Sequence, residues 1–266
     1  MDLELKGKTA VVTGGSRGIG KAIARELALE GVDVAISARD QAALEATAAE
    51  LASETGRRIV PIRADTRSDE DVKAMVRRAA SDFGHLDILV NNAAKAGGQA
   101  PAPKLSEITQ ELLWEDVDTK VMGYLRCARE AAPYMIERGW GRIINISGMA
   151  ARQTGSTIGS IRNVAVSAMT KNLADELGPH GINVTVVHPG LTRTEATAGV
   201  VADRARAQGV SEEEVERGMG QGNSVRRIVD AREIAYVVTF LASPKADAIT
   251  GDAIAAGGGV GAAIHY

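Results

Sequence analysis

The sequence predicts a single doubly wound α/β domain, in which helices cover both faces of a parallel sheet of about seven strands. Three observations lead to this prediction. Short β-branched runs alternate with longer helical segments along the whole chain. The length of 266 residues suits one large domain, and no linker, repeat or low-complexity segment divides it. A glycine-rich turn joins the first strand to the first helix, as in domains that bind dinucleotides.

The elements follow from their local patterns. Thr9–Val12 is a β-branched run typical of a buried strand, and apolar residues then recur at a helical period from Ile19. The segment 109–138 predicts a long helix that breaks near Thr119. Further strands are predicted over 32–38, 58–64, 86–91, 141–147, 182–188 and 253–256, and helices over 19–30, 41–54, 69–83, 161–177 and 231–241. Within this single 1–266 domain, we expect the polar, helix-prone stretch 191–227 to form a substrate lid.

Composition and charge exclude several classes of protein. Lys and Arg number 31 and Asp and Glu 34, so the formal net charge is −3, which argues against a nucleic-acid partner. The single Cys127 cannot form an internal disulfide and fits a reducing compartment. The N-terminus has no apolar signal core, and no run approaches the roughly 18 apolar residues of a membrane span. We therefore expect a soluble, cytoplasmic protein with no membrane partner.

The glycines after the first strand predict a phosphate site. They are Gly14, Gly15, Gly18 and Gly20, and a helix starts within this turn. Glycines permit the tight turn and let the backbone approach a pyrophosphate, while the helix N-terminus offers free N–H groups and the positive end of its dipole. The pattern predicts a nucleotide-binding Rossmann-type domain.

The end of the second strand indicates which cofactor binds. An acidic residue there would hold the ribose 2′-hydroxyl of NAD, whereas an arginine accommodates the 2′-phosphate of NADP. The chain has Arg39 at this point and no carboxylate before Asp40, and Arg17 lies in the glycine turn. The sequence therefore favours NADP(H) as the cofactor.

Other motifs in the same region are weaker. Gly14 to Gly18 also spells the Gly-x-Ser-x-Gly elbow of hydrolases, with Ser16 as nucleophile, but this motif belongs in a different turn. A P-loop is excluded because Ala22 stands where a metal-binding Ser or Thr is needed. The four histidines lack metal-ligand spacing, and no metal site is expected.

Motifs after later strands complete a family pattern. Asp65 follows the third strand, Asn91-Asn92-Ala93-Ala94 ends the fourth, and Pro189-Gly190 ends the sixth. With the glycine turn, these motifs make the chain resemble the short-chain dehydrogenase/reductase family from end to end. The resemblance implies a site at the carboxyl ends of the strands. It implies as cofactor-binding residues Gly14, Ser16, Arg17, Gly18, Ile19, Gly20, Arg39, Asp65, Thr66, Asn91, Ala93, Pro189, Gly190, Thr192 and Thr194.

The resemblance also implies partners. Members of the family act on small-molecule substrates and usually assemble through the long helices after strands four and five. The long helix here carries apolar residues on more than one side, which suits burial against another subunit. These residues are Tyr124, Leu125, Tyr134 and Met135. We expect a homodimer or homotetramer.

The catalytic positions depart from the family pattern. Members normally carry a tyrosine after the fifth-strand serine and a lysine four residues beyond that tyrosine, and Gly159 and Asn163 stand at these positions. The family's usual asparagine in the long helix is Lys120. Only Ser147 is retained, which leaves Ser147, Lys120 and Asn163 as the candidate catalytic residues.

Two interpretations of these changes stay open. Lysine and asparagine have exchanged positions, so Lys120 can place an ammonium where the family has one. Alternatively, Lys120 is a solvated helix lysine and the catalytic residues have been lost independently. For Arg152 and Arg162, surface charge is favoured over binding of an acidic substrate group, and His188 is expected to be packed rather than catalytic.

Three functions are consistent with the sequence. The favoured one is an atypical NADP(H)-dependent oxidoreductase of the short-chain dehydrogenase/reductase type, acting on a small carbonyl, alcohol or alkene. The alternatives are a non-redox enzyme on the same scaffold and a catalytically silent NADP(H)-binding subunit. Fold alone does not decide among them.

Overall fold

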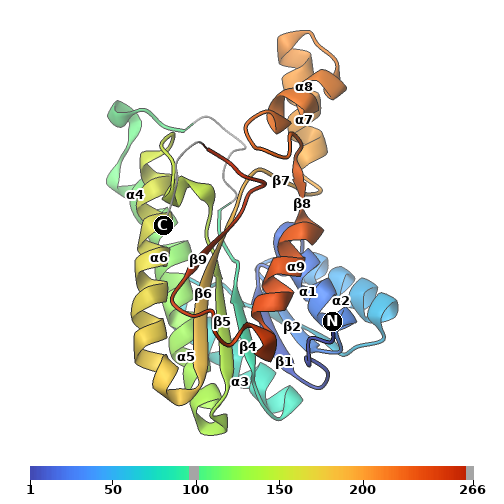
Figure 1. Ribbon diagram of the computed structural model, residues 1–266, viewed down its shortest axis with the longest axis vertical. Helices are drawn as coiled ribbons and strands as arrows, with labels where there is room; N and C mark the ends of the chain where they lie inside the picture. The colour runs from blue at the N-terminus through green and yellow to red at the C-terminus, as the bar shows by residue number, and fades with distance from the viewer. Residues whose placement is uncertain (96–101, 262–266) are drawn as a thin grey trace.

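The computed structural model describes residues 1–95 and 102–261. Its centre is a seven-stranded parallel sheet with the order β3-β2-β1-β4-β5-β6-β9 (Figure 1). The strand order reverses between β1 and β4, and open α/β sheets bind ligands at the carboxyl ends of strands beside such a switch point. The strands are β1 (Thr9–Thr13), β2 (Asp33–Ala38), β3 (Ile59–Arg63), β4 (Ile88–Asn91), β5 (Gly141–Ile146), β6 (Ile182–Pro189) and β9 (Ala253–Ala256).

Helices cover both faces of the sheet. One buried cluster joins α1, α2 and α9 to one face, and a second joins α3, α5 and α6 to the other (Figure 1). The arrangement is the doubly wound fold that the alternating pattern predicts. The helices on the two faces are α1 (Gly18–Leu29), α2 (Gln41–Thr55), α9 (Ala231–Leu241), α3 (Asp69–Phe83), α5 (Gly123–Arg138) and α6 (Thr157–Leu177).

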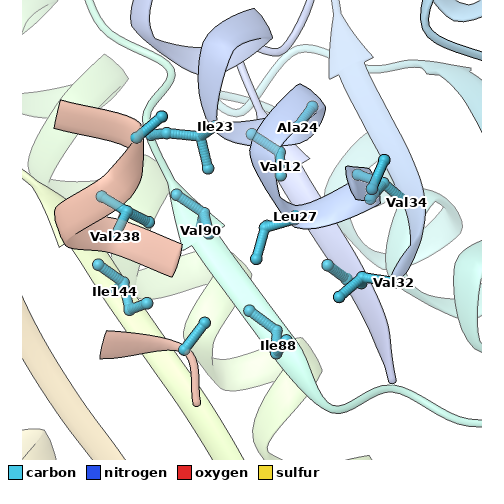
Figure 2. Packing of buried hydrophobic residues seen from close by; sticks show 14 of the residues in the cluster. Val12, Ile23, Ala24, Leu27, Val32, Val34, Ile88, Val90, Ile144 and Val238 are labelled. Atoms are coloured by element: carbon cyan, nitrogen blue, oxygen red, sulfur yellow. The ribbon is translucent and has the colours of Figure 1, made fainter. Parts of the chain in front are cut away.

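The strand β1 shows how the sheet joins the two clusters. All five of its residues are buried, and they alternate between the faces, with Val12 in the cluster below α1 and Val11 in the other. Figure 2 shows Leu27 of α1 and Val238 of α9 packed over Val90 of β4. Full burial of a side chain of this kind contributes roughly 1.5–3 kcal/mol, so these contacts fix α1 and its N-terminus on the sheet.

Helix caps account for several boundaries. The expected bounds of α3 and α9 are confirmed, and Ser68 caps α3 by accepting a hydrogen bond from the Asp71 backbone nitrogen at 3.1 Å. The prediction that α6 begins at residue 161 is wrong. Ser156 accepts a hydrogen bond from the Gly159 backbone nitrogen at 3.0 Å, and this cap starts the helix at Thr157.

The long helix is interrupted as expected. It consists of α4 (Gln110–Asp116), the π-helix η2 (Val117–Met122) and α5. A π-helical turn shifts the register of the side chains that follow it, and such turns occur often at functional sites. Lys120 lies within η2 and is buried.

The chain leaves the main sheet after β6 and returns at α9. This excursion contains α7 (Thr197–Gln208) and α8 (Glu212–Gly220), which extend away from the sheet beyond β7 (Thr192–Arg193) and β8 (Val229–Asp230) (Figure 1). The two helices have a small apolar cluster of their own around Val201. Among the described residues, no helix is both long and apolar enough to cross a membrane.

Candidate functional site

The glycine turn is packed too tightly for side chains at Gly14, Gly15 and Gly20. A Cβ atom on Gly20 would lie 2.2 Å from the carbonyl oxygen of Gly14, so α1 can start here only with glycine. Gly14 has a φ of +66°, in the left-handed region that favours glycine. Ser16 and Ile19 lie in the same stretch, and α2 holds it through Thr47, which donates to the Ser16 carbonyl at 2.8 Å. Because these positions carry no side chains, a ligand can approach the backbone of the turn.

The end of β4 is bonded directly to this turn. The hydroxyl oxygen of Thr13 accepts hydrogen bonds from the backbone nitrogens of Asn92 at 2.9 Å and Ala93 at 3.1 Å. The Asn92 side chain donates to the Gly14 carbonyl at 3.1 Å. Asn91 is buried and donates to Oδ1 of Asn145 at 2.9 Å. These bonds join the two motifs at the switch point of the sheet.

The N-terminus of α1 binds a carboxylate of the chain itself. The backbone nitrogen of Gly18 donates to Oε2 of Glu195 at 2.9 Å. A helix N-terminus of this kind is an anion site, and the carboxylate takes a place that suits a phosphate. No local sequence signal predicts this contact, because the two residues are 177 positions apart.

The segment after β6 brings Glu195 to the turn. Gly190 leaves no room for a side chain, since a Cβ there would lie 2.8 Å from Gly257. Thr192 donates to the Gly190 carbonyl at 3.0 Å, and Thr194 faces Gly18, where an added Cβ would lie 3.4 Å from its methyl group. The Pro189 motif and the glycine turn therefore meet, as the sequence predicts.

The charged residues expected around the adenosine lie at the ends of β2 and β3. Arg17 and Arg39 are exposed, and Asp40 is used to cap α2, accepting from the Ala43 nitrogen at 3.1 Å. Arg67 lies 2.8 Å from Asp65 and, with a smaller contribution from Arg39, lowers the pKa of that carboxyl. Thr66 is buried beside η2 and donates to the Thr119 carbonyl at 3.4 Å.

Lys120, Asn163 and Ser147 form one cluster, in which Lys120 and Asn163 are buried and Ser147 is partly buried. The Lys120 amine donates to Oδ1 of Asn163 and to the backbone carbonyl of Ser147, each at 2.9 Å. The Ser147 hydroxyl lies 3.2 Å from the same Asn163 oxygen. Lys120 and Asn163 are each only 4 % exposed. The interpretation of Lys120 as a solvated helix lysine is therefore wrong, because η2 turns its side chain inward.

The surroundings of Lys120 favour its neutral form. Burial, with a smaller contribution from the positive charge of Arg162, lowers the pKa of Lys120 to about 7, and Asp116 acts in the opposite direction. The amine has no carboxylate partner among its hydrogen bonds in the described structure. Ammonium and free amine are thus both populated near neutral pH, which is the condition for exchanging protons there.

Two other titratable side chains near this cluster are inert. Tyr124 is fully buried, donates its hydroxyl hydrogen to the Ile146 carbonyl at 2.8 Å, and has its pKa raised by burial. His188 is packed as expected, with Nε2 3.4 Å from the Ser167 hydroxyl. Burial lowers the pKa of His188 to about 4, so it is neutral at physiological pH.

The expectation that Arg162 is a surface charge is wrong, and Arg152 also has a hydrogen-bond partner within the protein. The Arg162 side chain forms an ion pair with Asp116, and the two side chains are only 11 % and 17 % exposed. Arg152 donates to the Ala253 carbonyl at 2.6 Å. The sequence did not single out Asp116, because its partner lies 46 residues away.

A cavity lies at the N-terminal end of α6, next to the position of the missing tyrosine. It has a volume of about 500 Å³, and its wall combines apolar surface with several polar side chains. Ser156, which caps the helix beside Gly159, belongs to this wall. The other polar lining residues are Lys104, Thr154, Thr157 and Ser160.

Known proteins resemble this chain along its length. A family model described as enoyl-(acyl carrier protein) reductase matches residues 14–261. The 3-oxoacyl-[acyl-carrier-protein] reductase FabG of Staphylococcus aureus is 35 % identical over 95 % of this chain and 98 % of its own. The NADPH-dependent reductase BacG of Bacillus subtilis is 31 % identical over 95 % of this chain and 97 % of its own.

Solved structures agree with the sequence matches. The L-sorbose reductase of Gluconobacter frateurii, solved with NADPH and L-sorbose, superimposes with a TM-score of 0.92 at 30 % identity and covers 98 % of both chains. A dehydrogenase/reductase of Sinorhizobium meliloti superimposes with a TM-score of 0.84 at 34 % identity, again covering 98 % of both chains. Together with the family model and the packed glycine turn, these matches show that the chain belongs to the short-chain dehydrogenase/reductase family.

Proposed function

We propose that the protein is an NADP(H)-dependent oxidoreductase that interconverts a small polar carbonyl compound and its alcohol, with Lys120 as the group that exchanges the proton. The observation that carries the proposal is the position of the Lys120 amine, buried and 2.9 Å from Asn163. A lysine without a function would be held in solvent, because burying an ammonium opposes folding.

The choice of NADP(H) is supported by the ends of β1 and β2. Arg17 and Arg39 are exposed there and can bind a 2′-phosphate, and Asp40, which follows Arg39 in the chain, is turned to its helix cap. The N–H of Gly18, which already binds a carboxylate, fits a pyrophosphate oxygen. BacG and the L-sorbose reductase, both similar to this chain, are described with NADPH.

Reduction of a carbonyl requires a hydride at carbon and a proton at oxygen. Bound NADPH supplies the hydride. Ser147 holds the substrate oxygen through its hydroxyl, and the ammonium of Lys120 is the source of the proton, which solvent restores after turnover. The pKa of about 7 lets Lys120 donate in the reductive direction and accept in the oxidative one.

Asn163 links these two groups in place of the family's lysine. Its carboxamide oxygen accepts from Lys120 and faces the Ser147 hydroxyl, so its Nδ2 remains as a donor. That nitrogen is directed to Gly148, where an added Cβ would lie 3.2 Å from it. Lysine and asparagine thus act as an exchanged pair, and Lys120 and Asn163 together supply an amine and an amide N–H to the site.

The cavity supports a polar substrate. Its wall carries hydroxyl groups from Thr154, Ser156, Thr157 and Ser160 and includes Lys104, which suits a hydroxylated carbonyl compound. The similar protein from Gluconobacter frateurii is named for the reduction of a ketose. In this account the 191–227 segment serves as the substrate lid.

The test is a screen for NADPH oxidation with purified protein. The panel contains ketoses including L-sorbose, a 3-oxoacyl thioester, aldehydes and activated alkenes. We expect turnover with a hydroxylated ketone or aldehyde, and its loss in Ser147→Ala. Binding of NADPH with no turnover of any substrate in either direction would contradict the proposal and favour a silent subunit. Conversion of a substrate without net NADPH oxidation would favour non-redox chemistry.

A further inference from the structure

We propose that Asp116 and Arg162 are positioning residues for Lys120, because their ion pair joins the end of α4, directly before η2, to α6 and sets two opposite charges near the buried amine. The inference rests on the proposed function of Lys120. It extends that function to two side chains that do not belong to the cavity lining in the described part of the chain.

The geometry places two contacts side by side between the same helices. Asp116 is the last residue of α4, directly before η2, and Arg162 directly precedes Asn163 in α6. The ion pair Asp116–Arg162 and the hydrogen bond Lys120–Asn163 therefore span the two helices at neighbouring positions. A π-helical turn has weaker internal hydrogen bonding than an α-helix, so an external contact at its start helps to fix its register.

Because the Asp116–Arg162 pair is largely buried, its charges act on Lys120 with little screening by solvent. With side-chain exposures of 11 % for Arg162 and 17 % for Asp116, both lie largely outside solvent, where charge interactions are screened less than at the surface. Arg162 lowers the pKa of Lys120 and Asp116 raises it. His188 also faces this amine, and it is neutral at physiological pH because its own pKa falls to about 4. The balance at Lys120 thus depends on the Asp116–Arg162 pair.

Single substitutions distinguish an effect of the ion pair on the pKa of Lys120 from a purely structural role in helix packing. Arg162→Gln removes the cation and leaves Asp116 unpaired, and both effects raise the pKa of Lys120. Asp116→Asn removes the anion and leaves Arg162 unpaired, and both effects lower it. We expect opposite shifts on the order of half a pH unit or more. Loss of helix packing alone would move the two variants in the same direction.

The chain offers a matched control on the same turn. Asp118, which lies in η2, pairs with Arg126 of α5 at 2.8 Å, and Arg126 also pairs with Asp69 of α3. Asp118→Asn breaks an ion pair of η2 without removing a charge that acts on Lys120, so the pKa of Lys120 should stay within about 0.2 units of the wild-type value. Arg162→Lys keeps the positive charge, so the pKa of Lys120 in this variant should also stay near the wild-type value. This variant tests the ion pair even if Arg162→Gln does not fold.

The experiment is a nitrogen NMR titration of lysine-labelled protein, in which the Lys120 signal is assigned by its absence in Lys120→Met. Opposite shifts in Arg162→Gln and Asp116→Asn support the inference. Shifts in one direction, or none, overturn it. The titration needs no substrate, so failure of the oxidoreductase proposal in the turnover screen stays distinguishable. Where turnover is found, its pH profile should move with the measured pKa in each variant.

Discussion

The amine of Lys120 and the carboxamide oxygen of Asn163 lie 2.9 Å apart, and we propose that each occupies the position that the family usually gives to the other. The contact joins a π-helical turn to α6, and both residues are buried. A single lysine at either position would supply one ammonium to this site. The paired exchange therefore keeps a cation beside Ser147 while it moves the side chain's origin to a different helix.

Cofactor preference should follow the arginines at the ends of β1 and β2. NADPH should bind at least tenfold more tightly than NADH, because charge-assisted hydrogen bonds contribute roughly 1.5–3 kcal/mol each. Arg39→Asp should narrow or invert this preference by repelling the 2′-phosphate. Fluorescence titration of both cofactors measures it, with Arg77→Ala on the exposed side of α3 as the control. Equal or reversed affinities in the wild-type protein would refute the NADP(H) assignment.

Glu195 should compete with the cofactor for the N-terminus of α1. Its carboxylate occupies the Gly18 N–H at 2.9 Å, and its charge repels an incoming phosphate. Glu195→Gln should therefore bind NADPH several-fold more tightly, as calorimetry can measure. Glu216→Gln is the control, since that carboxylate pairs with Arg193 instead. Unchanged or weaker binding in Glu195→Gln would show that this carboxylate does not compete.

The depressed pKa of Lys120 should appear in the pH dependence of stability. Between about 7 and its ordinary value of 10.5, the unfolded chain holds a proton on Lys120 that the folded protein releases. The free energy of unfolding of the wild type, relative to Lys120→Met, should therefore rise with pH across this window, with a slope of up to about 1.4 kcal/mol per pH unit.

Denaturant unfolding at a series of pH values measures this difference. Below the folded pKa the ammonium remains buried and destabilises the wild type, so the difference should level off there. Lys73→Met, which removes an exposed lysine of α3, should give no slope in the same window. A flat difference for Lys120→Met would mean that Lys120 titrates like a solvated lysine.

Assembly should involve the helices α4, α5 and α6. Trp114, Leu125, Ile161 and Val164 lie on these helices with 36 to 56 % of their surface exposed, and apolar side chains gathered in this way mark interaction surfaces. We expect a dimer or tetramer. Light scattering should give a multiple of 27.8 kDa for the wild type and a smaller mass for the double variant Leu125→Glu, Val164→Glu. A wild-type mass near 27.8 kDa at micromolar concentration would contradict this expectation.

The fold could be predicted because local sequence carries most of it. The alternating β-branched runs determine the strands, and capping residues such as Ser68 mark helix starts within one turn. The start of α6 was missed for a related reason. The start of this helix is marked by the hydroxyl of Ser156, which is its cap, and not by a period of apolar residues.

The site could be predicted only in part. The glycine turn and the Lys120–Asn163 exchange follow from motifs at known spacing. The roles of Glu195 and Asp116 could not be predicted from motifs, because each acts through one contact with a residue far away in the sequence. The side chain of Lys120 points inward because of the register of the π-helical turn η2. A helical period of apolar residues in the sequence does not reveal such a turn.

The central claim is that Lys120 exchanges the proton in an NADP(H)-dependent reaction. The most direct test is the pH profile of kcat/KM for NADPH-dependent reduction, measured for the wild type and for Lys120→Met. The account predicts that wild-type activity falls as pH rises through about 7, where Lys120 loses its proton, and that Lys120→Met loses this step together with at least a hundredfold of its activity. Lys120→Met should also bind NADPH more weakly, whereas Ser147→Ala should retain binding and lose turnover. An unchanged rate and pH profile in Lys120→Met would contradict the claim.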